Sequence, residues 1–372
     1  MNSRAAERRN GFAALALVVV TASACGGGTT PPASSGAPAG TAASASTPTS
    51  SSPSTLAAAG DSTQRPEGAW TLVTWPIKRS DTKDFQPIAN ISNMMITPSC
   101  TQGPCDLAFS TAESSNTSNG PGPAPTTGAV ESAKLLQFHW DGTSYVARKP
   151  AREVSCTAKV GAAEIPKGYT SKSTFKLSFL PPSAGGPARV HGTVIETNTG
   201  TKAGKGKGCR DFTETSAVSG SSTGSVDAAA LPQGAYDASM SSTGSTPKSL
   251  APVGAGFWLG PMTASGTKDA LTITGMTSAT APLAPATEGW DGNAPGAPMD
   301  CEAIDGSPAS KGSDGLESFS GLHPVAVTKS GDPIFSGTWR LRTNPNKVGL
   351  KAGCSLTRWE GRLLLVPHGA GL

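Results

Sequence analysis

The sequence predicts an all-β protein with two tandem, duplicated antiparallel domains, each closed by a disulfide, behind an N-terminal tether. The main observation is a frame of Cys, Gly-Thr and Cys that occurs twice. In each copy the first Cys lies 36 residues before the Gly-Thr pair and 53 residues before the second Cys. The two copies are Cys156, Gly192-Thr193, Cys209 and Cys301, Gly337-Thr338, Cys354. A repeat of this length predicts a duplicated domain rather than a solenoid.

Composition supports the same fold class. Of the 372 residues, 15% are charged and 36% hydrophobic, and the chain contains 45 Gly and 31 Pro. No sustained helical periodicity occurs, so short strands joined by turns are expected. The net charge is +4, and the leader holds three Arg and one Glu, which leaves +2 for the remainder. This weak charge argues against nucleic acid as a partner.

Residues 1–24 have the pattern of an export signal. Three arginines precede the apolar stretch 11–24, which is short for a membrane span. The stretch ends in Ala22-Ser23-Ala24-Cys25. This motif resembles the lipobox of bacterial lipoproteins, and the Ala-, Gly-, Ser- and Thr-rich composition suits an actinobacterial source. The resemblance implies that Cys25 carries lipid and holds the protein at the outer face of the cell membrane. The alternative is an ordinary cleavage site with Cys25 as a bystander.

Cysteine arithmetic favours the lipidated form. The chain has seven Cys, so one remains over when the others pair. If Cys25 carries lipid, the remaining six can form three disulfides. The predicted pairs are Cys100 with Cys105, Cys156 with Cys209, and Cys301 with Cys354.

Low-complexity segments divide the chain into domains. Residues 25–62 are rich in Pro, Ser, Thr and Ala and predict a disordered tether. Residues 63–218 then form a first β domain, 219–231 a linker and 232–372 a second β domain.

The first domain shows several strand signals. Apolar residues alternate with polar ones over 136–140 and again in Phe175, Leu177 and Phe179. Asp141-Gly142 predicts a hairpin turn, because such turns need a positive φ. Further strands are expected over 68–77, 89–97, 143–147 and 188–197, with a turn at 202–207.

The second domain repeats some of these signals. Gly234-Ala235-Tyr236 mirrors Gly68-Ala69-Trp70, and Trp290-Asp291-Gly292 mirrors Trp140-Asp141-Gly142. Both Asp-Gly pairs are interpreted as turns. Residues 362–366 form a closing strand. The pattern fits a sandwich or a barrel. The opening Gly-x-Trp, with Arg358-Trp359 near the end, resembles lipocalin-type barrels and implies a fold only.

No motif predicts a catalytic, metal or cofactor site. Gly220–Gly224 matches G-x-S-x-G, but its flanks are linker in composition, which does not suit a nucleophile elbow. The four His are not spaced as metal ligands. The seven Trp are expected as core residues and strand partners rather than as a sugar-binding platform, with Trp75 and Trp258 as the candidates for exposure. One basic cluster is a candidate contact for anionic groups. Its residues are Lys202, Lys205, Lys207 and Arg210.

These observations predict a non-catalytic, membrane-anchored envelope lipoprotein with a ligand-binding, partner-binding, sensor or structural role. The expected partners are the membrane, through the N-terminal lipid, and an envelope protein or cell-wall polymer. Two alternatives stay open: an envelope hydrolase with residues scattered on loops, and a lipid carrier with an apolar barrel cavity.

Overall fold

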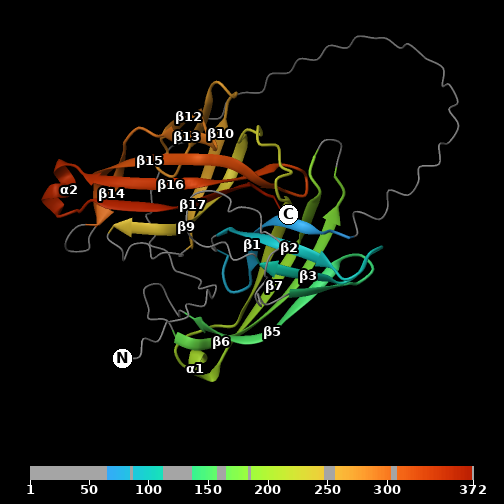
Figure 1. Cartoon of the computed structure of the whole chain (residues 1–372). Coiled ribbons are helices and arrows are strands. Elements are labelled where there is room, and N and C mark those ends of the chain that lie inside the picture. Colours follow the sequence, from blue (N-terminus) through green and yellow to red (C-terminus); the bar gives the residue numbers. More distant parts are fainter. Residues whose placement is uncertain are drawn as a thin grey trace, which may run out of the picture.

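The computed structural model describes residues 65–83, 87–111, 136–156, 165–182, 186–246, 256–302 and 308–370. The predicted signal peptide, Cys25 and the predicted tether lie outside these residues. Within them the chain forms two antiparallel sheets and two short helices, so the all-β prediction is confirmed (Figure 1).

The first sheet is a closed barrel. Its eight strands pair antiparallel in chain order, and the last strand pairs with the first. The strands are β1 (Gly68–Arg79), β2 (Asn90–Pro98), β3 (Leu107–Thr111), β4 (Leu136–Trp140), β5 (Tyr145–Cys156), β6 (Ile165–Leu180), β7 (Arg189–Gly200) and β8 (Phe212–Ser222). Closure leaves no sheet edge unpaired, and it decides between the barrel and the sandwich that the sequence left open.

Alternation along β6 places one apolar set inside this barrel. Phe175, Leu177 and Phe179 face the core, as predicted, while Lys172 and Lys176 face solvent. The core is formed by Trp70, Leu72, Ile96, Leu107, Phe109, Phe138, Tyr145, Ala147, Leu177, Val190 and Val218.

The second sheet has nine strands in the order β13-β12-β11-β10-β9-β17-β16-β15-β14. The long strand β15 pairs with β14 along one part and with β13 along another, which joins the sheet into a ring. We call it the second barrel. Its strands are β9 (Gly234–Thr246), β10 (Gly256–Ser265), β11 (Leu271–Thr274), β12 (Thr280–Ala286), β13 (Gly289–Asn293), β14 (Ala297–Glu302), β15 (Pro308–Val327), β16 (Pro333–Pro345) and β17 (Thr357–Pro367).

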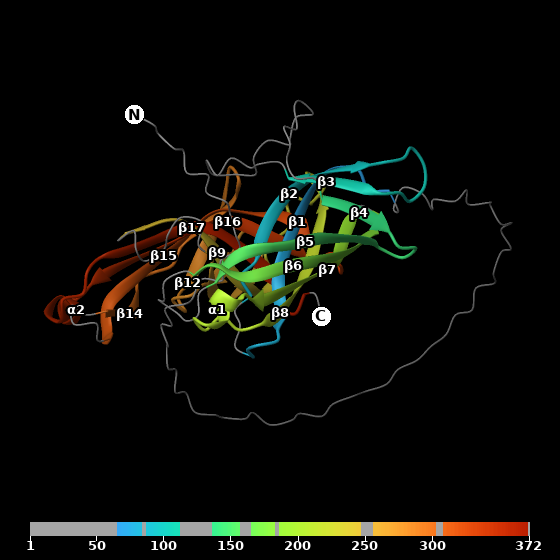
Figure 2. The ribbon, with the colours of Figure 1, turned by 90° about the horizontal axis from the view of Figure 1, so that it is seen from below.

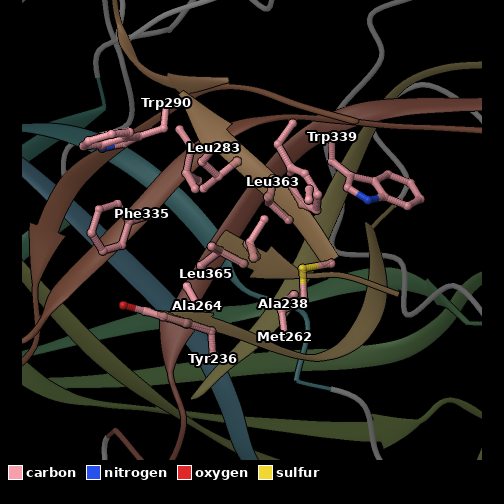
Figure 3. Close-up of a cluster of buried hydrophobic side chains, with 14 of the residues drawn as sticks. Tyr236, Ala238, Met262, Ala264, Leu283, Trp290, Phe335, Trp339, Leu363 and Leu365 are labelled. Atoms are coloured by element: carbon pink, nitrogen blue, oxygen red, sulfur yellow. The ribbon is translucent and has the colours of Figure 1, made fainter. Parts of the chain in front are cut away.

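The interior of the second barrel is filled with apolar side chains. Figure 3 shows Tyr236, Met262, Leu283 and Phe335 converging from different strands. Trp339 is 0% exposed and closes this core on the side of the disulfide.

The repeated frame occupies equivalent positions in the two barrels. Helix α1 (Lys202–Lys205) follows β7, and helix α2 (Lys347–Ala352) follows β16. In each copy a helix Gly packs on a backbone carbonyl beside the disulfide, Gly204 on Gly168 and Gly349 on Gly312. A Cβ at either helix Gly would overlap that carbonyl. The turn predicted at 202–207 is therefore a short helix followed by a turn, with Thr201 as N-cap. Common descent of the two halves stays a prediction.

All three predicted cysteine pairs are disulfides. The Cα–Cα distances are 6.0 Å for Cys100–Cys105, 6.3 Å for Cys156–Cys209 and 6.0 Å for Cys301–Cys354. The second and third bonds join the end of one barrel strand, β5 or β14, to the segment after each helix. They close equivalent ends of the two barrels.

One predicted correspondence is wrong. Trp290 lies in β13 opposite Leu322, and Tyr145 of the first barrel lies in β5 opposite Leu177. Trp290 therefore matches Tyr145 and not Trp140. Asp141 does form a turn cap, but Asp291 lies within a strand, where it accepts a hydrogen bond from Gly321 N at 2.7 Å. The dipeptide Asp-Gly was a turn signal in only one of the two places because strand pairing overrides local preference.

The two barrels lie side by side (Figure 2). An apolar layer packs between them. Its buried residues are Val73, Trp75, Ala89, Ala217, Ala326, Ile334, Leu364 and Val366. Trp75 is 3% exposed, and its Nε1 donates to the carbonyl of Ala370 at 3.1 Å. Trp75 therefore belongs to a core, as expected for most of the Trp, and is not one of the exposed residues, whereas Trp258 is half-buried.

The segment between the barrels begins later than its composition suggests. Strand β8 continues to Ser222, within the predicted linker 219–231, and Ser219 and Ser221 are buried where β8 pairs with β1. Small polar residues are typical of linkers in a sequence. They also fit a barrel strand at a place where a second barrel packs closely against it.

Candidate functional site

The interiors of the two barrels differ at equivalent positions near their disulfides. Strands β6, β7 and β8 pair in the same way as strands β15, β16 and β17. A residue of β7 or β8 corresponds to the residue 145 positions later, in β16 or β17. At these positions Val194, Glu196 and Glu214 of the first barrel correspond to Trp339, Leu341 and Trp359 of the second. Large apolar side chains thus fill the second barrel where the first carries a small apolar residue and two carboxylates.

As a result, the interior of the first barrel stays open to solvent on this side. Thr74, Phe175 and Val194 point inward from three strands and are half-buried, although they adjoin fully buried core residues. In the second barrel, Phe319 and Trp339 hold the positions of Phe175 and Val194, and both are buried. An inward side chain that is only half-buried marks a place where a barrel is not filled.

Two carboxylates lie side by side on this inner surface. Glu196 and Glu214 are direct neighbours across β7 and β8. Ser171 Oγ donates to Glu196 Oε1 at 2.9 Å, and Asn198 Nδ2 donates to the same oxygen at 3.1 Å. These two buried donors hold Glu196 in place and leave its second oxygen free of side-chain partners among the described contacts.

Glu214 has a different environment. Burial raises its pKa, Arg79 opposes the rise and the charge of Glu196 adds to it. Arg79 lies opposite Glu214 across β1 and β8; it also donates to Asp81 at 2.7 Å, and its guanidinium lies 3.8 Å from the ring centroid of Phe212. Like charges directly opposite each other in a sheet are unfavourable, and Arg79 on β1 offsets part of the repulsion between Glu196 and Glu214.

A basic group stands at the rim. Lys149 is exposed, and its Nζ lies 5.1 Å from the ring centroid of Phe175. Partial desolvation lowers the pKa of Lys149, the charge of Arg152 adds to this effect, and the charge of Glu196 opposes it. Strand register directs Lys149 inward, because it lies opposite the inward-facing Ser173 of β6, and the cation–π contact places its ammonium beside Phe175.

We call this set the lumen site. It combines an apolar floor with carboxylates, hydroxyl and amide groups and a rim cation. Its residues are Thr74, Lys149, Ser171, Phe175, Val194, Glu196, Asn198 and Glu214. Such a surface can bind a small amphipathic molecule with hydroxyl or ammonium groups, because carboxylate oxygens accept hydrogen bonds from both.

The sequence did not single out these residues, although a signal existed. The repeated frame aligns the two copies without a gap from Gly192 to Cys209, so Glu196 could have been set against Leu341. Equal spacing does not show that both positions face the interior of a barrel. That knowledge comes from strand register.

The predicted basic cluster lies elsewhere. Lys202 and Lys205 belong to α1, and Lys207 follows it in the turn before Cys209. Lys205 pairs with Asp211 at 3.1 Å, whereas Lys207 and Arg210 are exposed. Contact of this cluster with anionic groups stays a prediction.

The histidines do not join the lumen site. His139 is exposed and pairs with Asp106 at 2.7 Å. His191 faces the neighbouring barrel, and burial lowers its pKa with help from Lys329 and Arg189. Across the described ranges no cluster of three or more potential metal ligands occurs, and no helix there has the length and apolarity to cross a membrane.

The second barrel holds a buried carboxylate that the sequence did not predict. Glu317 is 0% exposed. It accepts hydrogen bonds from Met276 N at 3.0 Å, Thr277 N at 3.1 Å, Thr277 Oγ1 at 2.9 Å and Trp339 Nε1 at 2.5 Å. Gly275 packs so closely on this carboxylate that a Cβ would overlap it. All its partners are structural, so Glu317 ties the β11–β12 turn to the core.

Fold and site together define a disulfide-bonded protein of two packed β-barrels, one filled and one with a polar, partly open interior. No protein-family model matches the chain, and no curated protein does. A solved structure titled "putative AttH", from Nitrosomonas europaea, aligns over 81% of this chain and 92% of its own, with 11% identity and a TM-score of 0.19. At that score the likeness has no bearing on fold or function.

Proposed function

We propose that this protein is a lipid-anchored binding protein of the cell envelope, whose first barrel receives a small amphipathic ligand. The observation that carries the proposal is the contrast between the two interiors. Trp339 and Leu341 are buried and fill the second barrel, with the half-buried Trp359 beside them, whereas Val194, Glu196 and Glu214 leave the first one partly open.

The lumen site suggests how such a ligand would lie. Its apolar part would contact Phe175 and Val194, beside the core of the barrel. Its hydroxyl or ammonium groups would meet the free oxygen of Glu196 and the carboxyl of Glu214. Carboxylate oxygens of both residues accept hydrogen bonds from hydroxyl and ammonium groups.

Filling the lumen should abolish binding. We expect Val194→Trp, which copies the residue of the second barrel at this position, to remove binding of octyl glucoside monomers, the probe for an alkyl chain with a polyhydroxyl head. Isothermal titration calorimetry below the micelle concentration measures the effect, which should be at least about tenfold because the apolar floor is lost.

Ile195→Trp is the matched control. Ile195 is the next residue on β7, faces outward and is 44% exposed, so the same side chain added there should leave binding unchanged. Undiminished binding by Val194→Trp, or no binding by the natural protein, contradicts the proposal. Hydrolysis of the probe would instead favour the hydrolase, with Glu196 and Glu214 as its carboxylates.

The lipid anchor has a separate test. Cys25→Ser should release the protein from washed membranes into the soluble fraction, because two acyl chains provide the stable part of the attachment. Fractionation of the producing cell, with immunodetection of the protein, gives the distribution. If the membrane-bound fraction of the Cys25→Ser protein equals that of the natural protein after washing, the anchor lies elsewhere.

A further inference from the structure

Exposed apolar side chains gather at the end of the second barrel that carries α2. Val348 is 58% exposed, Leu350 66% and Leu356 42%. Only two other large hydrophobic residues in the described part of the chain, Ile195 and Leu316, are as open to solvent. A cluster of this kind marks a site of contact with a partner or a membrane.

The scaffold holds these side chains outward. Asn346 caps α2 by accepting hydrogen bonds from Val348 N and Gly349 N at 2.9 and 3.2 Å. Gly349 packs on the carbonyl of Gly312, and the Cys301–Cys354 disulfide closes the segment after the helix. Because Gly349 faces the barrel, Val348 and Leu350 on either side of it must project into solvent.

Lysines surround the apolar group. Lys311, Lys347 and Lys351 are exposed, and Asn346 Nδ2 donates to the carbonyl of Lys311 at 2.6 Å, which joins the two segments. Asp300 is the acidic residue in contact with this group, through Lys311 N at 2.8 Å. We call the set the α2 tip. It comprises Lys311, Lys347, Val348, Leu350, Lys351 and Leu356.

The apolar part of the tip is particular to the second barrel. Ala203 and Lys205 of α1 stand where α2 has Val348 and Leu350. The first barrel thus presents a basic end without large apolar side chains, although the helix, the buried Gly and the disulfide are the same. The scaffold alone therefore does not require Val348 and Leu350.

The α2 tip is also well placed to meet a surface. It forms the outer end of the second barrel, away from the first barrel, in both views (Figures 1 and 2). The segment between Cys25 and Arg65 has about 40 residues, which can span up to about 130 Å when extended. A chain anchored at Cys25 could therefore bring this end of the molecule to the bilayer.

We propose that the α2 tip inserts into an anionic lipid surface. Val348, Leu350 and Leu356 enter the boundary between headgroups and acyl chains, and the three lysines contact lipid phosphates, as in other interfacial anchors. Attachment through so few residues is weak and reversible, so it orients an anchored protein rather than holding it. The proposal is independent of the lumen site.

Vesicle binding tests the tip without the lipid anchor. The full chain carrying Cys25→Ser is sedimented with vesicles of equal parts phosphatidylglycerol and phosphatidylcholine. We expect binding that weakens with salt and is much lower on phosphatidylcholine alone. Adding Val348→Ser and Leu350→Ser should weaken partitioning at least about tenfold, as expected for loss of two apolar contacts.

Two matched variants show whether the effect belongs to the tip. Ile195→Ser removes an exposed apolar residue of the first barrel and should change nothing. Lys202→Gln with Lys205→Gln neutralises α1 and should have a much smaller effect. The proposal is overturned if the protein with the natural tip does not bind vesicles, or if the α1 variant alone abolishes binding. It is also overturned if Val348→Ser with Leu350→Ser leaves vesicle binding unchanged and instead converts a dimer to a monomer in sedimentation velocity.

Discussion

Glu317→Ala should destabilise the second barrel by about 3–5 kcal/mol, the range for breaking a buried charged network. The change would leave Met276 N, Thr277 N and Trp339 Nε1 without an acceptor inside a core that excludes water. It would also open a cavity beside Gly275. Urea unfolding followed by tryptophan fluorescence measures the loss, because Trp339 reports on this core.

Asp314→Ala is the control for Glu317→Ala. Asp314 lies on the same strand and is exposed, so its removal should change stability by less than about 0.5 kcal/mol. Glu317→Gln keeps the shape and one acceptor oxygen, so it should lie between these two values. A loss below about 1 kcal/mol for Glu317→Ala would show that water or a shifted turn replaces the carboxylate.

Removing the Cys156–Cys209 disulfide should cost the first barrel about 4 kcal/mol. The two residues are 53 apart in sequence, and constraint of the unfolded chain grows with the size of the loop. The double variant Cys156→Ala with Cys209→Ala avoids free thiols. Guanidinium unfolding of this variant, compared with the natural protein under oxidising conditions, gives the difference.

The short loop at the other end of the same barrel is the comparison. Cys100 and Cys105 are 5 residues apart, so Cys100→Ala with Cys105→Ala should cost only about 2 kcal/mol. An equal loss for both pairs would mean that local packing, such as Gly168 against the sulfur of Cys156, outweighs chain entropy. Ligand binding at the lumen site should also fall more when the Cys156–Cys209 disulfide is removed, because that disulfide lies at the lumen end of the barrel.

The two disulfides and the buried Glu317 differ in how far they could be foreseen. Cys156 and Cys209 were paired from their spacing, since an equal spacing recurs at Cys301 and Cys354. Glu317 stood out in the sequence through no motif or spacing. Its burial depends on Trp339 and on a turn 40 residues earlier, neither of which its neighbours in the chain reveal.

The lumen site shows the same limit. Phe175, Leu177 and Phe179 were placed on the inner face of a strand from their period of two, and the structure confirms this. Glu196 and Glu214 were not placed, because a charged residue in an alternating strand is normally assigned to the solvent side. Pairing with Ser173 and with each other puts both carboxylates inside.

The amino-acid sequence by itself thus determined the all-β class, the repeated frame and the three cysteine pairs, because these depend on local periodicity, composition and covalent spacing. Only the tertiary structure decided that the sheets close into barrels, that Trp75 lies between them, and that one interior is filled and the other partly open. Those features depend on strand register, which brings together residues distant in the chain and sets which side chain faces inward.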